Sequence, residues 1–151
     1  MAAKPRFSLI RKAKIGAGTV IRDHVNLYGC TIGKNCKIES FVYIEEGVVI
    51  GDGCKIKAHT FIPTGVRIGK KVFVGPGVIF TNDMYPTVND DFKLYYTTVE
   101  DNASIGGGAV IIPGIKIGKE AMVGAGAVVT RDIPAGVLAY GNPARVVKKL
   151  K

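Results

Sequence analysis

Residues 32–80 read IGKNCKIESFVYIEEGVVIGDGCKIKAHTFIPTGVRIGKKVFVGPGVIF and carry an apolar residue at every sixth position. Nine of these positions follow one another without a break: Ile32, Ile38, Ile44, Ile50, Ile56, Ile62, Ile68, Val74 and Phe80. An amphipathic helix repeats about every 3.6 residues and a strand about every 2. A period of six fits neither alone, but it fits a short strand followed by a corner.

The same spacing continues on both sides of this stretch. Upstream and downstream members bring the total to eighteen hexads: Ile15, Ile21, Leu27, Val99, Ile105, Ile111, Ile117, Val123 and Val129. Three strand-and-corner units close one triangular coil, so the pattern predicts about six stacked coils over residues 9–134. Stacked coils lie about 4.8 Å apart, the ordinary strand spacing. Such a solenoid is stabilised by contacts between neighbouring repeats.

Composition agrees with a single all-β domain over residues 1–151. The chain has 20 glycines, which suit tight corners, and a hydrophobic fraction of 47%, which is enough for a core. Three cysteines cannot form a closed set of disulfides, so Cys30, Cys36 and Cys54 are interpreted as small core residues. The apolar runs are too short to span a membrane, and no secretion signal is apparent. We therefore expect a cytoplasmic protein.

Two segments interrupt the period. Residues 84–98 (MYPTVNDDFKLYYTT) separate Phe80 from Val99, so we expect them to leave the triangle as one extruded loop. Residues 135–151 form an irregular tail. Within that tail, residues 144–151 predict a short basic C-terminal helix.

The net charge of +9 favours an anionic partner but does not identify it. The basic residues gather near the two ends of the chain without aromatic residues between them. A nucleic-acid groove usually offers stacking aromatics. We therefore expect a phosphorylated small molecule, with no nucleic acid and no membrane as partner.

Three motifs connect the chain with a known family. The hexads, GAGAVVTRDIP at residues 124–134 and GNPAR at residues 141–145 resemble the hexapeptide-repeat acyltransferases over nearly the whole chain. Within that family, FTNDMYP at residues 80–86 resembles the sugar-nucleotide 3-N-acetyltransferases. The resemblance implies a left-handed parallel β-helix and a homotrimer with active sites between subunits. It also implies transfer of acetyl from acetyl-CoA to the amine of a nucleotide-linked amino sugar.

One column of equivalent corner positions loses its side chains along the coil. It contains His24, Phe41, His59, Gly77, Gly108 and Gly126. The glycines predict a shallow track in which the pantetheine arm of acetyl-CoA lies against the backbone. The resemblance implies contacts with acetyl-CoA from Gly107, Gly108, Ala125 and Gly126 along the arm, from Thr130 and Arg131 at the adenine end, and from Arg145 to a phosphate.

Acyl transfer to an amine needs a positioned nucleophile, a proton acceptor and a donor to the developing oxyanion. Asn82 is the leading catalytic candidate, because the resemblance implies that this asparagine holds the amine. Many relatives carry a histidine where this chain has Asp83 or Met84. His59 is the alternative base, since an imidazole accepts a proton near neutral pH. For the oxyanion we hypothesise the backbone N–H of Gly77.

The acceptor is expected to contact the coils before the loop and the loop itself. The predicted substrate contacts are His24, Asn26, Tyr28, Asp83 and Tyr85. These side chains do not indicate which nucleotide the acceptor carries or which ring position bears the amine.

Other functions are possible on the same coil. The main enzyme alternative is an N- or O-acetyltransferase with another small acceptor, such as serine, an antibiotic or a free sugar. A non-catalytic trimeric binding scaffold is the alternative of another class. The γ-class carbonic anhydrases need three histidines around zinc, and the chain has two, so no metal site is expected. A Rossmann-type domain is disfavoured because no long helical period precedes the tail.

Overall fold

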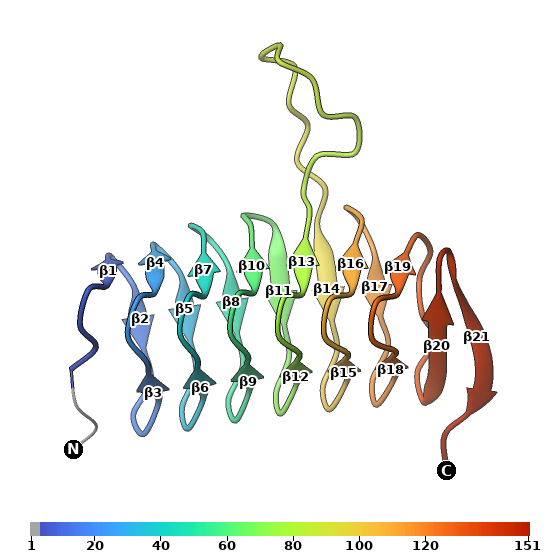
Figure 1. The fold of residues 1–151 in the computed structure, drawn as a ribbon, viewed down its shortest axis with the longest axis horizontal. Helices are drawn as coiled ribbons and strands as arrows, with labels where there is room; N and C mark the ends of the chain where they lie inside the picture. The colour runs from blue at the N-terminus through green and yellow to red at the C-terminus, as the bar shows by residue number, and fades with distance from the viewer. Residues whose placement is uncertain (1–3) are drawn as a thin grey trace.

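The computed structural model describes residues 4–151, which form a parallel β-helix with three flat sides (Figure 1). Sheet A contains seven strands: β1 (Leu9–Arg11), β4 (Asn26–Tyr28), β7 (Tyr43–Ile44), β10 (Phe61–Ile62), β13 (Ile79–Phe80), β16 (Val110–Ile111) and β19 (Val128–Val129). Sheet B contains six: β2 (Lys14–Ile15), β5 (Thr31–Ile32), β8 (Val49–Ile50), β11 (Val66–Ile68), β14 (Thr97–Val99) and β17 (Lys116–Ile117). Sheet C contains eight: β3 (Val20–Ile21), β6 (Lys37–Ile38), β9 (Lys55–Ile56), β12 (Phe73–Val74), β15 (Ser104–Ile105), β18 (Met122–Val123), β20 (Val137–Gly141) and β21 (Ala144–Lys149).

Each hexad of the sequence forms one strand and one corner. The eighteen strands from β2 to β19 are the eighteen predicted hexads. The sheet register stacks their apolar residues in columns, so that Ile50 pairs with Ile32 below and Ile68 above. Sheet A nevertheless has seven strands, because β1 adds a strand below the first hexad. The helix therefore has about seven turns where the hexads alone predicted about six.

The inward columns form one continuous hydrophobic core. Most of their side chains are fully buried, Phe80 at the root of the loop among them. Cys30, Cys36 and Cys54 are buried and free, which confirms them as small core residues. Burial raises the pKa of the Cys30 thiol. A hydrogen bond with Cys36, together with burial, raises the pKa of the Cys54 thiol. The thiols of Cys30 and Cys54 are therefore protonated at neutral pH.

The loop leaves the helix between β13 and β14 and projects away from the coils (Figure 1). It comprises residues 81–96, where the sequence predicted 84–98, because Thr97 and Thr98 already belong to β14. Thr97 is buried, and its hydroxyl accepts a hydrogen bond from the backbone N–H of Gly114 at 3.1 Å. The returning arm packs closely on Gly65, where an added Cβ would lie 2.8 Å from a methyl carbon of Leu94.

The tail forms a hairpin, and the predicted C-terminal helix at residues 144–151 is wrong. β20 continues sheet C in parallel with β18, and β21 then returns antiparallel to β20, with Tyr140 opposite Arg145. The outer edge of β20 would otherwise expose unpaired backbone groups, which β21 satisfies. Val146 and Val147 are β-branched and suit this strand. The hairpin therefore closes the C-terminal end of the helix (Figure 1).

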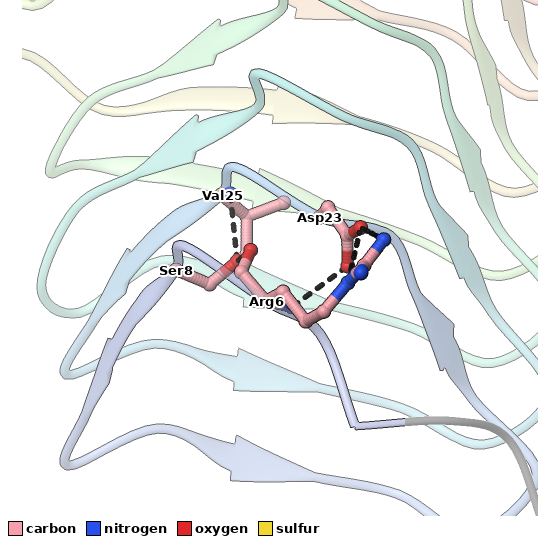
Figure 2. A network of polar contacts seen from close by, with 4 residues as sticks. All are labelled: Arg6, Ser8, Asp23 and Val25. Carbon is pink, nitrogen blue, oxygen red and sulfur yellow. Dashed lines mark hydrogen bonds and ion pairs between the residues drawn. The ribbon is translucent and has the colours of Figure 1, made fainter.

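The first described residues are fastened to the second coil by side chains (Figure 2). The Ser8 hydroxyl accepts a hydrogen bond from the backbone N–H of Val25 at 3.1 Å and donates one to the Arg6 carbonyl. Asp23 accepts a hydrogen bond from the backbone N–H of Arg6 at 2.7 Å. The Arg6 guanidinium also lies 3.3 Å from the Asp23 carboxylate. These contacts lower the pKa of Asp23, chiefly through the backbone N–H of Arg6.

Candidate active site

One edge of the triangle, between sheets C and A, holds the column that the sequence predicted. We call it the ladder corner and define it by its residues of positive φ: Phe7, His24, Phe41, His59, Gly77, Gly108 and Gly126. In its lower half the four rings stack on one another. Their centroids are 5.3, 5.0 and 4.9 Å apart from Phe7 to His59, with interplanar angles of 12° or less. Each ring covers its neighbours' faces, so the ladder ends with the face of His59 toward Gly77.

The upper half of the ladder corner carries no side chains. An added Cβ would meet no atom of residues 4–151 within 4 Å at Gly108 or Gly126. At Gly77 it would meet only the Gly108 backbone nitrogen, at 4.0 Å. The backbone does not demand glycine here, because Phe41 and His59 hold nearly the same φ, 62° and 61°. The three glycines therefore leave an open strip along the helix axis that the described chain itself does not fill.

Two backbone N–H groups along this strip are available to a ligand. The amides of Gly107 and Ala125 precede the corner glycines, and they donate to no acceptor within residues 4–151. Such unpaired donors suit the amide carbonyls of an extended arm. The structure thus makes the predicted pantetheine contacts of Gly107 and Ala125 geometrically possible.

The Gly77 N–H is a different case, and the hypothesis that it stabilises the oxyanion is not supported. It donates to the Ala58 carbonyl at 2.9 Å, as part of the hydrogen bonding between adjacent coils. A donor committed to a backbone carbonyl is not free for a developing negative charge. Because Gly77 has no side chain, it leaves the space above His59 open.

The hairpin lies at the far end of the open strip. Met122 pairs with Leu138 and Val123 with Ala139, so continuing that register stacks Gly141 over Ala125 and the next residue over Gly126. Arg145 pairs with Tyr140 beside this turn and is exposed, with one guanidinium N–H donating to the Ala144 carbonyl at 2.9 Å. An exposed guanidinium at the end of the strip suits a phosphate.

Thr130 and Arg131 lie elsewhere. They follow β19, so they stand at the corner between sheets A and B, whereas the open strip runs along the corner between sheets C and A. Within one chain they therefore do not join Gly126 or Arg145. Their predicted contact with the adenine end requires the strip of another copy of the chain.

Asn82 also stands at the corner between sheets A and B, at the root of the extruded loop. It is partly buried, and its side-chain NH₂ donates to the Thr64 carbonyl at 3.0 Å. A carbonyl only accepts, so this bond fixes which end of the amide faces Thr64. The Oδ1 of Asn82 points the other way and has no partner within residues 4–151.

The three predicted catalytic residues therefore do not gather within one chain. Gly77 and His59 stand at one end of the sheet A strands, and Asn82 stands at the other end of β13. Asn82 follows Gly77 by five positions, so at about 3.3 Å per extended residue the two lie about 16 Å apart. His59 and Asn82 can serve one reaction only if two chains meet.

The predicted acceptor contacts also lie in separate places, some in a groove of sheet A and one in the ladder corner. Asn26 and Tyr28 line a groove of about 460 Å³ on the lower part of sheet A, which reaches up to Thr64. His24 is in the ladder, with both ring faces covered by Phe7 and Phe41. Only its ring edge is open to a ligand.

The two predicted loop residues differ in their freedom. One carboxylate oxygen of Asp83 accepts a hydrogen bond from the backbone N–H of Tyr85 at 3.1 Å, which forms a turn at the start of the loop. Asp83 thus has a structural role already. Tyr85 is 78% exposed, and Phe92 and Tyr96 on the same loop are 54% and 70% exposed. Apolar rings so exposed on a projecting loop suit contact with another molecule.

Sequence reasoning missed four polar residues of the groove: Arg11, Glu45, Glu46 and Thr64. Arg11 contributes a cation at its lower end, and Glu45 and Thr64 form its upper rim. The Glu45 carboxylate accepts a hydrogen bond from the Thr64 backbone N–H at 3.0 Å. The register that stacks Arg11 with Tyr28 was not available in the hexads, because Arg11 belongs to β1, which precedes the first hexad. The Glu45 contact depends on a side-chain rotamer, which no periodicity predicts.

Two other classes of site find no support in the described part of the chain. Within residues 4–151 no three His, Cys, Asp or Glu side chains are grouped so that they would hold a metal ion. The same residues contain no helix that is long and apolar enough to cross a membrane.

The repeat of this chain matches a known family model. Residues 29–64 and 96–131 match the family model described as bacterial transferase hexapeptide (six repeats). The chain is built of hexapeptide repeats. Its parallel β-helix is accordingly left-handed, as the resemblance implied. None of the curated protein sequences matches this hexapeptide-repeat protein significantly.

Solved structures share the coil. PerB from Caulobacter crescentus, in complex with CoA and GDP-perosamine, is 29% identical with a TM-score of 0.68, and the match covers 93% of this chain. The hexapeptide-repeat protein spans only 58% of the length of PerB. AntD, an N-acyltransferase from Bacillus cereus in complex with dTDP and 3-hydroxybutyryl-CoA, is 23% identical with a TM-score of 0.81, covering 96% of this chain and 84% of AntD. At that identity, AntD supports the fold alone.

Proposed function

We propose that this hexapeptide-repeat protein is an acetyl-CoA-dependent N-acetyltransferase whose acceptor is the amine of a nucleotide-linked amino sugar. The observation that carries the proposal is the open strip of the ladder corner. Three successive corners, at Gly77, Gly108 and Gly126, are bare although the backbone accepts side chains there. PerB, which shares the coil, was solved with CoA and a nucleotide-linked sugar, and this similarity supports both substrates.

The donor fits the strip from end to end. From Gly77 to Gly126 the strip rises by two coils, about 10 Å at about 4.8 Å per coil, and the turn of the hairpin lies one coil further, so the path suits the flexible pantetheine arm. The N–H groups of Gly107 and Ala125 meet its amide carbonyls, and Arg145 meets a phosphate at the hairpin end. The thioester then lies near Gly77, next to the exposed edge of His59, where a ring nitrogen can accept a proton.

The active site is proposed to be shared between subunits of a homotrimer. Asn82 of one chain meets the ladder corner of the next and so reaches the thioester bound there, whereas the thioester on its own chain lies about 16 Å away. Thr130 and Arg131 stand at the same corner as Asn82, so the same packing brings them to the strip of the neighbour. The exposed rings of the loop, Tyr85 and Phe92 among them, are then covered by that neighbour.

The chemistry is a single acyl transfer without a metal. The Oδ1 of Asn82 accepts a hydrogen bond from the amine and orients its lone pair toward the thioester carbonyl. The C–N bond forms, the C–S bond breaks, and the proton that the amine loses goes to His59 and then to the departing CoA thiolate. Both substrates are cytoplasmic metabolites, so we place the reaction in the cytoplasm.

The ring position of the amine has two candidates. The FTNDMYP segment at residues 80–86 resembles 3-N-acetyltransferases and favours a 3-amino sugar. PerB was solved with GDP-perosamine, a 4-amino sugar nucleotide, so a 4-amino sugar is the second candidate. In either case the groove of sheet A offers Arg11 to the diphosphate and Asn26 and Tyr28 to the rest of the acceptor.

Release of free thiol from acetyl-CoA tests the proposal. The acceptors are UDP-, GDP- and dTDP-linked 3-amino and 4-amino sugars, and the controls are serine, free amino sugars and the corresponding hydroxyl sugars. Turnover restricted to an amino sugar nucleotide supports donor, reaction and acceptor class together. Turnover with serine or a free sugar instead means another small acceptor, and absence of both turnover and acetyl-CoA binding means a non-catalytic scaffold.

Two substitutions test the site assignment. Asn82→Ala removes the group that orients the amine, and His59→Phe keeps the ladder stacked while removing the imidazole nitrogens. Each is expected to lower kcat by about 100-fold, the usual worth of a positioned polar group. If both variants keep near-normal turnover with the true amine, the assignment of the catalytic residues is wrong. The shared active site also requires that the wild-type protein sediments as a trimer and not as a monomer.

A further inference from the structure

The corner between sheets A and B links three successive coils by hydrogen bonds that converge on Asn82. Glu45 belongs to the lowest of these coils, Thr64 to the middle one and Asn82 to the uppermost. The Thr64 backbone N–H donates to Oε2 of Glu45 at 3.0 Å, and the Thr64 carbonyl accepts from the Asn82 side chain at 3.0 Å. Thr64 thus connects the Glu45 carboxylate to the side-chain amide of Asn82.

This connection constrains the direction of the Asn82 side chain. A hydrogen bond from a backbone N–H to a carboxylate is stronger than one between neutral groups. On the other side of Thr64 the chain is held as well, because the Gly65 carbonyl accepts a hydrogen bond from the Thr97 backbone N–H at 3.0 Å. The Thr64 carbonyl is therefore held from both sides, and the Asn82 amide is held by that carbonyl.

We propose that Glu45 is a positioning residue of the acetyl transfer: it fixes Thr64, and through Thr64 it aims the Oδ1 of Asn82 at the acceptor amine. The inference rests on the proposed function. Glu45 and Thr64 also line the groove of sheet A. The amine therefore sits at the upper rim of that groove, and the rest of the acceptor extends down toward Arg11.

Glu46 provides a matched control. It is the next residue, it carries the same charge, and it is exposed. Like Glu45 it lines the groove of sheet A, but within residues 4–151 its carboxylate forms no ion pair and accepts no hydrogen bond from a backbone N–H. Glu46→Ala thus reproduces the loss of charge at this corner without the loss of the contact to Thr64.

The first measurement does not depend on the reaction. In the full-length protein, hydrogen exchange of the Asn82 side-chain NH₂ is followed by NMR with selective asparagine labelling. Glu45→Ala is expected to speed this exchange at least about 10-fold, because the Thr64 carbonyl becomes mobile. Glu45→Gln, whose amide oxygen still accepts from the Thr64 N–H, and Glu46→Ala are expected to leave it unchanged. Unchanged exchange in Glu45→Ala overturns the inference.

The second measurement is steady-state acetyl transfer with the acceptor found in the panel. Glu45→Ala is expected to lower kcat between about 10- and 100-fold, the cost of a misplaced group, with KM for acetyl-CoA unchanged. Glu45→Gln should stay within about 3-fold of wild type, and Glu45→Ala should add little to Asn82→Ala because the two act as one unit. A Glu45→Gln variant as damaged as Glu45→Ala would mean that the charge itself acts, which overturns the positioning role.

The two readouts separate this inference from the proposed function. If the exchange responds as expected and wild type acetylates no amine, the proposed function fails and the coupling of Glu45 to Asn82 stands. If wild type is active and the exchange does not respond, the function stands and the positioning role fails.

Discussion

The lower and upper halves of the ladder corner have the same backbone and opposite surfaces. From Phe7 to His59 the corner positions carry stacked rings, and from Gly77 to Gly126 they carry none. Their φ angles agree within a few degrees, between 61° and 71° from His24 to Gly108. Conformation therefore does not explain where the glycines are. In this fold, therefore, a run of glycines at an outer corner indicates that the space beside the chain is kept open.

Filling the strip should have the largest effect. Gly108→His places a ring where the chain already tolerates one at His59, so the fold is expected to survive with a loss of about 1–2 kcal/mol from the left-handed conformation. The ring occupies the proposed path of the pantetheine arm. Affinity for acetyl-CoA, measured by calorimetry, should fall about 100-fold, or about 2.7 kcal/mol.

The control for this variant lies in the lower half. Phe7→His exchanges one ring for another far from the strip, and it should leave acetyl-CoA affinity unchanged. Equal affinity of Gly108→His and wild type would show that the strip does not hold the donor, and the contrast between the two halves would then lose its functional meaning.

Opening the ladder should have an intermediate effect, on stability and not on the donor. Phe41→Ala removes two stacked pairs, each worth about 0.5–1.5 kcal/mol, so the free energy of unfolding in urea should fall by about 1–3 kcal/mol. Phe41→Gly loses the same pairs but relieves the left-handed conformation, and it should be the more stable of the two by about 1 kcal/mol. If the order of these two variants is reversed, the stacked rings and the backbone cannot be treated as separate contributions.

The smallest effect is expected at the foot of the ladder. Asp23, beside His24, has a lowered pKa because it accepts from the Arg6 backbone N–H and pairs with the Arg6 guanidinium. A carboxyl whose pKa is lowered in the folded state stabilises it above the unfolded pKa, about 4, and this contribution is lost as pH falls through the folded value. Asp23→Asn should therefore flatten the decrease of the urea midpoint between about pH 5 and pH 2. An identical decrease in both proteins would place the acid sensitivity elsewhere.

The sequence predicted the coil well because its signal is a spacing repeated many times. Every hexad from Ile15 to Val129 became a strand, and the column from His24 to Gly126 was correctly aligned. The ends were predicted poorly for a physical reason. β1 and β20 lie where the period is lost, and their pairing is set by the neighbouring coil. The tail at residues 144–151 looked helical by composition, whereas the open edge of β20 decides its structure.

The candidate site was predictable only in part. Bare corners can be read from glycines, so the strip followed from alignment of the coils, whereas the contacts of Gly107 and Ala125 with the donor were implied by the family resemblance and stay a prediction. The hexad spacing also implies that Asn82 and His59 lie at different corners of the coil. The sequence analysis nevertheless placed them in one catalytic group, because it assigned them by function. The hydrogen bonds of Gly77 and Glu45 depend on peptide and side-chain orientation, which a pattern of residue types does not carry.

The coils are stacked at equal intervals, so the length of the bare strip at the ladder corner can change only by whole coils. Positions along the strip are available only at multiples of about 4.8 Å, because side chains can be removed or restored one coil at a time. If the strip holds the donor as proposed, a longer or shorter arm is matched by a change of one whole coil, at Gly77 or Gly126, and not by gradual adjustment. The proposed selectivity for arm length would then change only in steps of one coil.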